Sequence, residues 1–353
     1  MDAFDYDLPQ DRIATRPCEP RESARLLVHC RSTGTNEHLH VRDLPDVLEQ
    51  GDLLVRNDTQ VVQARLVGTR ACTSDGRGGG KVEGLWVGQD DDGAWRLMLK
   101  AGGQLQPGER LSFDGGLQVD LVEPDDRYWR ARPVIARDSA SQLSEGGRTP
   151  LPPYILKARQ RRGEVVDDPR DVQWYRTRFA SDARAGSVAA PTAGLHLTDA
   201  VDASMRDRGV DIACGTLHVG EGTFRPVEAD RLADHDMHAE HWSVDDHTMA
   251  RLHQGPDGGR LIAVGTTTTR LLESLPETLP EGGCAGSTDL CIAPGHQWRR
   301  VQGLLTNFHL PRSTLLALVA ALTGLEALHA IYAEAIEREY RFYSYGDAMV
   351  VLP

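Results

Sequence analysis

After Gly186 the chain alternates short apolar segments with longer segments of helical periodicity, a pattern that few folds can accommodate. Ser313 supplies a helix N-cap, and Gly324 separates the last two helices. The predicted strands are residues 212–218, 261–264, 290–292 and 304–306, and the predicted helices are residues 199–208, 245–253, 268–275, 313–322 and 325–340. Because strands that alternate with helices form largely parallel sheets, we predict an α/β domain with a large, mostly parallel or mixed sheet.

Residues 63–150 have a different pattern, in which short alternating segments are separated by Gly, Asp and Pro. The six predicted strands are residues 64–69, 82–87, 95–100, 110–113, 117–122 and 128–133. A spacing of about 8–15 residues with turn signals is typical of a small antiparallel barrel or sandwich. We therefore predict a β-barrel domain over residues 63–150, inserted into an α/β domain made of residues 1–62 and 151–353.

The segments that flank this insertion are shorter and more mixed. Before it we predict strands at residues 26–28 and 52–55, with a short helix within residues 38–50. After it, the two prolines of residues 151–155 predict an extended segment, since proline disfavours helix in the residue before it. Residues 157–169 are highly charged and are predicted to form a loop.

Composition narrows the possible functions. The formal net charge of −13 argues against a protein that coats nucleic acid through a basic surface, but an RNA could still bind at a local basic patch. Such basic clusters are residues 157–162, residues 176–184 and Arg299 with Arg300. Six scattered cysteines without a CxxC pair, an acidic N-terminus and no membrane-length apolar run predict a cytoplasmic protein with reduced thiols.

Several apolar segments end in clusters of Thr, His, Gly and Asn. These clusters are residues 192–196, 216–223, 265–270 and 306–309. Glycine permits close approach of backbone to a ligand, whereas Thr and His supply hydroxyl and imidazole groups. Ligands of α/β proteins bind at the carboxyl ends of the strands, so we expect these clusters to form one cleft.

Residues 235–241 are rich in metal-ligand types. On a helix, His235, His238 and His241 could hold zinc, which would suggest a metal-dependent hydrolase. In an extended segment His238 and Glu240 would instead share one face of a polar strand, which we favour. A nucleic-acid-binding barrel is a third reading, but the barrel aromatics are not clustered into a stacking strip.

Eight long strings of residues occur in one order along nearly the whole chain. They are GDLLV-x-N (Gly51–Asn57), LPPYI (Leu151–Ile155), GSVAAPTAGLH (Gly186–His196), TLHVGEGTFRPV (Thr216–Val227), MHAE (Met237–Glu240), VGTTTTRLLES (Val264–Ser274), LLTNFHLPRSTLL (Leu304–Leu316) and YRFYSYGDAM (Tyr340–Met349). In these strings the chain resembles the S-adenosylmethionine:tRNA ribosyltransferase-isomerases of queuosine biosynthesis.

This resemblance implies an α/β domain with an inserted β-barrel, and it implies a reaction. The ribosyl part of S-adenosylmethionine is moved onto the aminomethyl group of 7-aminomethyl-7-deazaguanine at a tRNA wobble position. The ribose is isomerised to an epoxycyclopentanediol, which gives epoxyqueuosine and releases adenine and methionine. S-adenosylmethionine is then a substrate, and tRNA is the partner. We expect no metal, no resident cofactor, no membrane contact and a monomer.

The chemistry requires a base for the acidic carbon next to the sulfonium and an acid for the departing adenine. The candidate catalytic residues are His196, His218, Glu240, His309 and Asp347. The candidate substrate-binding residues are Asn57, Thr59, Thr192, Gly194, Gly222, Thr223, His238, Thr266, Thr267, Arg270, Asp289, Asn307, Arg341 and Tyr345. Base and acid stay unassigned; our hypothesis is that His218 or Glu240 takes the proton and Asp347 faces the sulfonium.

The chain also departs from the family pattern. Gln60 stands where the family usually has arginine, which would weaken phosphate contacts. Residues 288–296 lack aromatic residues that are usual there, and Gln302 replaces a common acidic residue. A divergent relative with an altered acceptor is therefore an alternative, beside the metal-dependent hydrolase.

Overall fold

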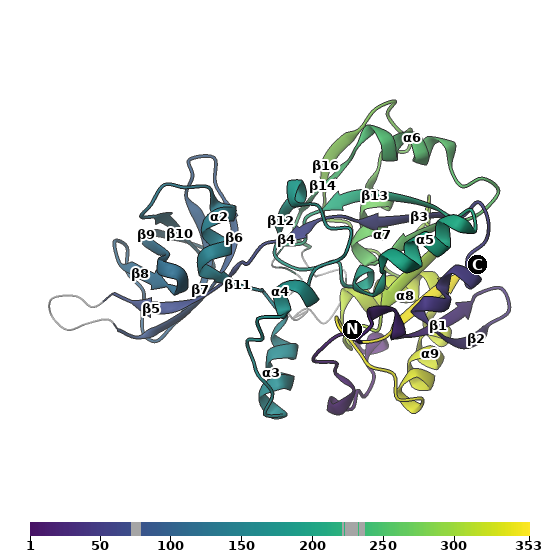
Figure 1. Ribbon diagram of the computed structural model, residues 1–353, viewed down its shortest axis with the longest axis horizontal. Coiled ribbons are helices and arrows are strands. Elements are labelled where there is room, and N and C mark those ends of the chain that lie inside the picture. Colours follow the sequence, from purple (N-terminus) through teal and green to yellow (C-terminus); the bar gives the residue numbers. More distant parts are fainter. Residues whose placement is uncertain (72–78, 221, 223–231, 233–236) are drawn as a thin grey trace.

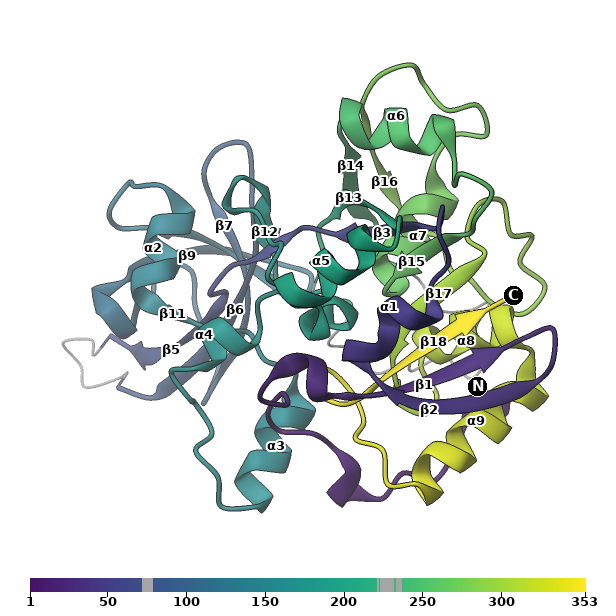
Figure 2. The same ribbon diagram turned by 45° about the vertical axis from the view of Figure 1, so that its right-hand side comes forward.

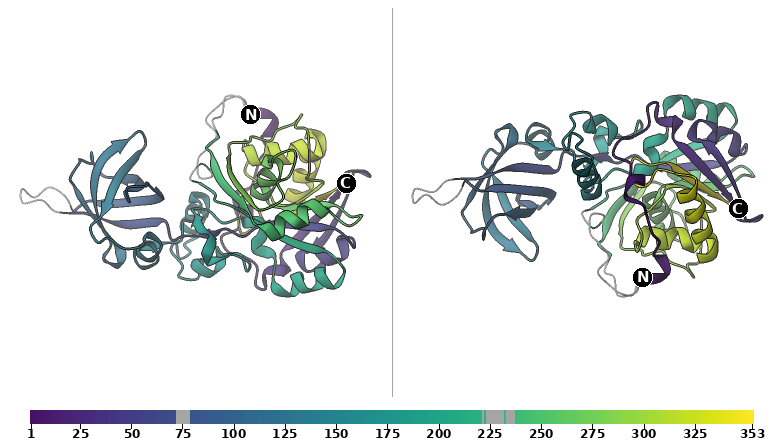
Figure 3. Two further views of the ribbon diagram at one scale, coloured as in Figure 1. Left: turned by 90° about the horizontal axis from the view of Figure 1, so that it is seen from above. Right: turned by 90° about the horizontal axis from the view of Figure 1, so that it is seen from below.

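The computed structural model describes residues 1–71, 79–220, 222, 232 and 237–353. These residues form a larger α/β body, which carries both termini, and a smaller β body beside it (Figure 1). A narrow neck joins the two bodies (Figure 3).

The α/β body is built on one mixed sheet. Among the described residues its strand order is β16-β14-β13-β3-β15-β17-β18-β1-β2. The strands are β1 (Arg25–Cys30), β2 (Thr35–His40), β3 (Leu53–Asn57), β13 (Asp211–Leu217), β14 (Glu240–Val244), β15 (Leu261–Val264), β16 (Cys284–Thr288), β17 (Gly303–Asn307) and β18 (Ala348–Leu352). The central strands β13, β3, β15 and β17 are parallel, whereas β14 and β18 run antiparallel to their inner neighbours. The predicted mixed α/β sheet is therefore confirmed.

Helices cover both faces of this sheet because residues of its strands alternate between two apolar cores. They are α1 (Leu44–Val47), α5 (Asp199–Asp207), α6 (Asp246–Gln254), α7 (Thr266–Ser274), α8 (Thr314–Thr323) and α9 (Leu325–Glu337). Leu53 and Leu304 pack in the core that contains residues of α6, α7, α8 and α9. Leu54 and Leu305 pack in the other core, with residues of α1 and α5. Ser313 caps α8 by accepting a hydrogen bond from the Leu316 amide at 3.2 Å.

One prediction for this body is wrong. Residues 290–292 are not a strand, because the side chain of Thr288 accepts a hydrogen bond from the Leu290 amide and Arg270 donates to the Leu290 carbonyl. These side-chain bonds replace the ladder bonds of a strand, and β16 precedes this segment instead. The short helix predicted within residues 38–50 is confirmed as α1, and His38 belongs to the preceding strand β2.

The smaller body is an antiparallel barrel. Its strands are β5 (Arg65–Arg70), β6 (Lys81–Gln89), β7 (Trp95–Ala101), β8 (Arg110–Phe113), β9 (Gln118–Asp125), β10 (Tyr128–Pro133) and β11 (Gly147–Arg148), with α2 (Ser139–Gly146) before β11. The pairing of β5 with β8 closes the barrel, which packs Leu66, Trp95 and Leu97 inside. All six strands predicted for this region are present. The predicted division into two domains at residues 62/63 and 150/151 stays a prediction.

The neck contains a two-stranded parallel pair, β4 (Gln60–Val61) with β12 (Ala185–Ser187). Below it lie α3 (Pro153–Arg161) and α4 (Asp171–Trp174) (Figure 1). The extended segment predicted at residues 151–155 is therefore wrong from residue 153 onward, and the loop predicted at residues 157–169 is wrong for residues 157–161 but right for residues 162–169. Pro152 is the N-cap of α3 and Pro153 its first residue, and proline is favoured at a first helical position because its missing N–H has no helical partner there.

No single helix among the described residues combines the length and apolarity needed to cross a membrane. The helices α8 and α9 meet that criterion only as a pair, and they are bent by 113° at the break between them.

Arg159 holds α3 in place. Its buried guanidinium makes a bidentate ion pair with Asp171 at 2.6 and 2.7 Å and donates to the Thr15 carbonyl. Removal of one partner from a buried pair leaves an uncompensated charge, so Arg159→Ala should lower the free energy of unfolding by about 3–5 kcal/mol in urea titration. The exposed Arg161, on the same helix, is the control, and Arg161→Ala should cost about 0.5 kcal/mol. Equal costs for the two variants would contradict this account.

Candidate functional site

The carboxyl ends of the parallel strands lie on one edge of the sheet. The four central parallel strands are β3, β13, β15 and β17 (Figure 2), and their last residues are Asn57, Leu217, Val264 and Asn307, in that order. The antiparallel neighbours begin on the same edge: β14 starts at Glu240, and the first residue of β18 pairs with Asn307. The clusters predicted at distant places in the sequence are thus brought to a single edge, which we call the carboxyl edge.

Asn57 ties three elements together at this edge. Its Oδ1 accepts from the amides of Leu217 and Thr59, both at 3.1 Å. Its Nδ2 donates to the Leu217 carbonyl at 2.8 Å and to Thr267 Oγ1 at 3.3 Å. Every polar atom of the buried amide is engaged, so Asn57 fixes β3, β13 and the start of α7 relative to one another.

His218 follows β13 and lies against Thr59 and Gly186. The Nδ1 atom of His218 is 2.9 Å from Thr59 Oγ1, and no described residue hydrogen-bonds its Nε2. A Cβ atom on Gly186 would lie 3.3 Å from the imidazole, so only glycine fits easily at that position. Burial lowers the pKa of His218 below its ordinary value; the Asp58 carboxylate opposes this shift, and His241 and Arg184 add to it. The ring is therefore neutral near pH 7 and able to accept a proton.

Glu240 and Arg270 form a buried ion pair next to His218. Arg270 Nη1 contacts Glu240 Oε2, and the Gly220 amide donates to Glu240 Oε1 at 3.1 Å. The guanidinium also donates to the carbonyls of Thr288 and Leu290. Both partners are about nine-tenths buried, so the pair anchors the backbone around Gly220 in the site rather than leaving a free carboxylate.

A second group lies at the end of β17. Thr192, in the short helix η7 (Thr192–His196), donates to Asn307 Oδ1 at 2.8 Å, and Asn307 Nδ2 is 3.1 Å from His196 Nε2. Burial lowers the pKa of His196 to about 3, and the charges of Arg341 and Arg21 act in the same direction. His196 is thus a neutral hydrogen-bonding group.

Gly265 connects the two groups. A Cβ atom there would lie 3.4 Å from Ala193 Cβ and 3.8 Å from Thr267 Oγ1, so η7 and the first turn of α7 meet at this glycine. Its φ of 89° is a backbone conformation that side chains other than glycine rarely adopt. Thr266 is buried at the start of α7. The two groups therefore belong to one continuous site.

Two predicted glycines and one histidine also lie at the carboxyl edge. A Cβ atom on Gly194 would meet Phe179 at 2.5 Å, and one on Gly222 would meet His238 at 3.0 Å. Thr223, the remaining candidate of the same loop, lies outside the described residues.

His309 is held by internal contacts. Its Nε2 lies 2.8 Å from Thr306 Oγ1, its amide donates to Tyr332 Oη at 2.9 Å, and Tyr6 Oη donates to its carbonyl. Burial lowers the pKa of His309 to about 3. These contacts favour a structural role for His309 rather than a contact with substrate.

Asp347 and its neighbours are also engaged within the fold. The Asp347 carboxylate accepts from the amides of Arg25 and Arg341 at 3.0 and 2.8 Å, and the Arg341 guanidinium lies 3.5 Å away. Tyr345 is buried against Tyr175, with ring centroids 6.0 Å apart. These contacts favour a structural role for the three predicted residues.

Two residues of the site, Gly186 and Asp58, were not among the predicted site residues, and one predicted substrate-binding residue, Asp289, lies outside the site. Gly186 opens a string already identified, but its contact with His218 required the fold. Asp58 follows Asn57 and accepts from Thr216 Oγ1 at 2.6 Å, and burial raises its pKa against the effects of Thr216 and Arg184. Asp289, by contrast, is exposed beyond the end of β16.

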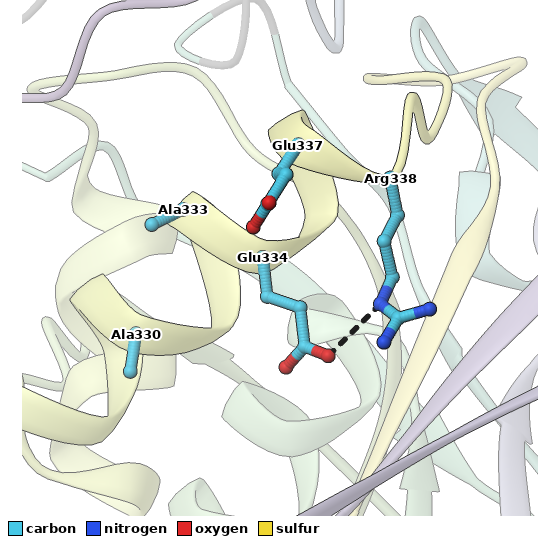
Figure 4. A pocket seen from close by; sticks show the side chains of 5 residues that line it. All are labelled: Ala330, Ala333, Glu334, Glu337 and Arg338. Atoms are coloured by element: carbon cyan, nitrogen blue, oxygen red, sulfur yellow. Dashed lines mark hydrogen bonds and ion pairs between the residues drawn. The ribbon is translucent and has the colours of Figure 1, made fainter.

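Within the described residues, no three His, Cys, Asp or Glu side chains are grouped as a metal site would require. His235, one member of the suggested zinc set, lies outside those residues. A surface hollow does exist on α9 (Figure 4), where Arg338 donates to Glu334 at 3.0 Å. Four of its lining residues come from α9 and the fifth, Arg338, is the C-cap of that helix; none is a predicted site residue.

Comparison with known proteins gives one consistent family. The family described as "Queuosine biosynthesis protein" matches residues 1–351. A relative from Jannaschia sp. (strain CCS1), named S-adenosylmethionine:tRNA ribosyltransferase-isomerase, is 44% identical over 100% of this chain and 97% of its own length. A relative of the same name from Gloeobacter violaceus is 44% identical over 100% and 96%. The crystal structure of S-adenosylmethionine tRNA ribosyltransferase from Thermotoga maritima is 30% identical, with a TM-score of 0.53 over 99% of this chain and 100% of that chain.

The two buried histidines, His196 and His309, predict a stability that depends on pH. An unfolded histidine takes up a proton below about pH 6.5, whereas the folded pKa values are about 3, so stability is complete above pH 6.5 and falls as the pH is lowered. Between pH 6.5 and 5.0 the two should together lower the free energy of unfolding by roughly 3 kcal/mol. Urea titration at each pH measures this loss. His309→Gln should remove about half of the slope, and an unchanged slope would contradict the assignment.

Proposed function

The chain belongs to the queuosine biosynthesis protein family, and on that basis we propose that it is an S-adenosylmethionine:tRNA ribosyltransferase-isomerase. It transfers and isomerises the ribosyl group of S-adenosylmethionine onto 7-aminomethyl-7-deazaguanine at the tRNA wobble position. The products are epoxyqueuosine-tRNA, adenine and methionine. The observation that carries this proposal is the full-length similarity, supported by the single carboxyl edge that gathers the polar residues of the matched strings.

His218 is the proposed base for the proton next to the sulfonium. Its ring is neutral, and its Nε2 has no described partner. Glu240 is less suited because Arg270 and the Gly220 amide stabilise its charged form and so reduce its affinity for a proton. Of the two candidates left open by the sequence, we therefore assign His218 as base and Glu240 as the partner that positions Arg270.

The hydrogen bonds of Thr59 favour the tautomer of His218 that can accept a proton at Nε2. The Thr59 hydroxyl has one proton, and it lies 3.4 Å from the Arg184 carbonyl, which can only accept. When Thr59 donates there, its oxygen accepts from Nδ1–H of His218 at 2.9 Å. The lone pair is then on Nε2, which is the state required of a base.

The remaining residues of the carboxyl edge are proposed to bind the substrate, and the acid that protonates the departing adenine stays unassigned. Thr192 and Asn307 orient the adenine, with neutral His196 as a hydrogen-bond partner. Thr266 and Thr267 present hydroxyl groups to the ribose. The predicted contact of Asp347 with the sulfonium is replaced by a structural role, since both of its oxygens already accept hydrogen bonds.

We further propose that the enzyme works as a cytoplasmic monomer without a resident cofactor or metal. Its two-domain division is the predicted one, with the barrel over residues 63–150. S-adenosylmethionine enters and leaves as a substrate, so each turnover consumes one molecule and releases adenine and methionine.

The proposed reaction is tested with the full-length protein, S-adenosylmethionine and a tRNA that carries 7-aminomethyl-7-deazaguanine. Nucleoside mass spectrometry should detect epoxyqueuosine, and chromatography should detect adenine in equal amount. A tRNA with unmodified guanine at the wobble position is the control and should yield neither product, since it lacks the nucleophilic amine. Absence of both products with the precursor tRNA would refute the proposal, and adenine release with a different modified nucleoside would support an altered acceptor.

The choice between the two candidate bases is tested by substitution. His218→Ala should lower kcat for adenine release by about 10²–10⁴-fold, the usual contribution of a general base. Glu240→Gln should lower kcat by less than His218→Ala, because the amide oxygen keeps one of the two hydrogen bonds that the carboxylate accepts and only the positioning of Arg270 and Gly220 is weakened. His253→Ala is the control, since His253 is exposed on α6 and contacts only the Pro280 carbonyl. If His218→Ala keeps full turnover, the assignment is wrong.

A further inference from the structure

The basic clusters seen in the sequence differ in how their charges are used. In the cluster of residues 176–184, Arg176 pairs with Asp182 at 3.0 Å and Arg178 with Asp199 at 2.8 Å. The Arg184 side chain forms no hydrogen bond or ion pair with any described residue, although its backbone amide and carbonyl are both bonded. Arg184 is therefore the cation of this cluster that is free to meet an external anion.

The other clusters are almost fully engaged. Arg159 is buried with Asp171, and Arg161 and Arg162 donate to Gln10 and to backbone carbonyls of the N-terminal segment. The guanidinium groups of residues 299 and 300 donate to backbone carbonyls around Glu273 and Pro276. Lys157 has no partner among the described residues, but no contact links it to the carboxyl edge. Of the described residues in these clusters, this leaves Arg184 as the cation beside the candidate site that has no ion-pair partner, although its charge also acts on the Asp58 carboxylate.

Arg184 lies where the buried residues of that site give way to exposed ones, a position that we call its mouth. Its carbonyl accepts from Thr59, whose hydroxyl also contacts His218. The next residue, Ala185, pairs with Gln60, so Arg184 lies where β12 joins β4 in the neck (Figure 1, Figure 3). Arg184 is partly exposed there, whereas the site behind it is buried.

The charges of the two substrates determine which of their groups Arg184 can bind. In the proposed reaction the sulfonium is cationic, and the aminomethyl group is an ammonium until it loses its proton and becomes the nucleophile, so Arg184 would repel both groups unless an anion lies between. The two substrates offer two kinds of anion, the carboxylate of the methionine part and the phosphodiesters of the RNA. An enzyme that acts on a base draws the base into its pocket while the backbone stays outside. A guanidinium at the mouth therefore suits a phosphodiester, which it binds through two parallel hydrogen bonds.

Gln60 provides a second, independent observation at the same place. Its Nε2 donates to the Val61 carbonyl, but its Oε1 is buried and has no hydrogen-bond partner among the described residues. A buried acceptor without a donor is costly, so a ligand that supplies a donor would satisfy it. The ribose 2′-hydroxyl of an RNA nucleotide is such a donor, and it lies next to a phosphodiester.

We propose that Arg184 binds a phosphodiester of the tRNA beside the wobble nucleotide, and that Gln60 Oε1 accepts a hydrogen bond from the ribose of the same segment. This inference rests on the proposed function. It also accounts for how a chain that lacks arginine at position 60 retains a phosphate contact, since the residue just before the strand that pairs with Gln60 supplies one.

The test compares full-length Arg184→Gln and Arg184→Lys with the wild type. Filter binding of the precursor tRNA is measured between about 50 and 200 mM salt, and KM is measured separately for tRNA and for S-adenosylmethionine. Arg206→Gln is the control: it removes the same charge from an exposed position on α5 whose side chain has no described partner. Arg206 lies near the end of α5, which leads into the start of β13 at the opposite edge of the sheet.

Arg184→Gln should weaken tRNA binding by about tenfold and reduce the slope of log affinity against log salt by about 0.7–0.9, the value of one phosphate contact. Arg184→Lys should restore the slope but only part of the affinity, because lysine keeps the charge without the bidentate geometry. Unchanged tRNA binding and slope would overturn the inference, as would a rise in KM for S-adenosylmethionine alone, which would assign Arg184 to the methionine carboxylate. In each of these cases wild-type product formation leaves the proposed function standing.

Discussion

The candidate site depends on one side-chain amide. Asn57 uses both its oxygen and its nitrogen to join the end of β3 to Leu217 of β13, and the same nitrogen reaches Thr267 at the start of α7. These elements lie far apart in the sequence and carry Thr59, His218 and the hydroxyl groups of α7. Because the amide is buried, loss of either half would leave unpaired backbone groups in the core, at about 1–3 kcal/mol each. A carboxylate could not replace it, since it lacks the donor.

Electrostatics then divides the site into distinct parts. The substrate sulfonium is a permanent cation, and protonated histidines beside it would oppose its binding. Burial keeps His196 neutral, and it also lowers the pKa of His218. Glu240 and Arg270 neutralise each other, so they hold the Gly220 backbone without adding net charge. The free cation, Arg184, lies at the mouth rather than inside. A protein of net charge −13 can thus receive RNA at one point without a generally basic surface.

Much of this arrangement could be predicted from the sequence because it depends on local patterns. The alternation of apolar and polar residues predicted the barrel strands, and the alternation of strands with helices predicted the parallel centre of the sheet. The polar clusters were recognised because parallel strands must end on one edge.

Partners distant in the sequence could not be predicted. Asp347 has a carboxylate that could bind a cation, yet its oxygens accept hydrogen bonds from the amides of Arg25 and Arg341. The helix α3 was missed because its two prolines resemble an extended segment, whereas the first occupies the N-cap and the second the first turn.

Only a few bonds in the neck connect the proposed RNA contact at Arg184 to the proposed base, His218. Thr59 and Gln60 are adjacent, and their partners are adjacent too: the Arg184 carbonyl immediately precedes Ala185, the first residue of β12. A phosphodiester bound by the Arg184 side chain would therefore restrain the same peptide whose carbonyl accepts from Thr59. Thr59 would then donate to that carbonyl rather than to His218, which leaves the proton of His218 on Nδ1 and the lone pair on Nε2. If the RNA binds at Arg184 as proposed, the same peptide would therefore connect the bound phosphodiester to the tautomer of His218 that acts as a base.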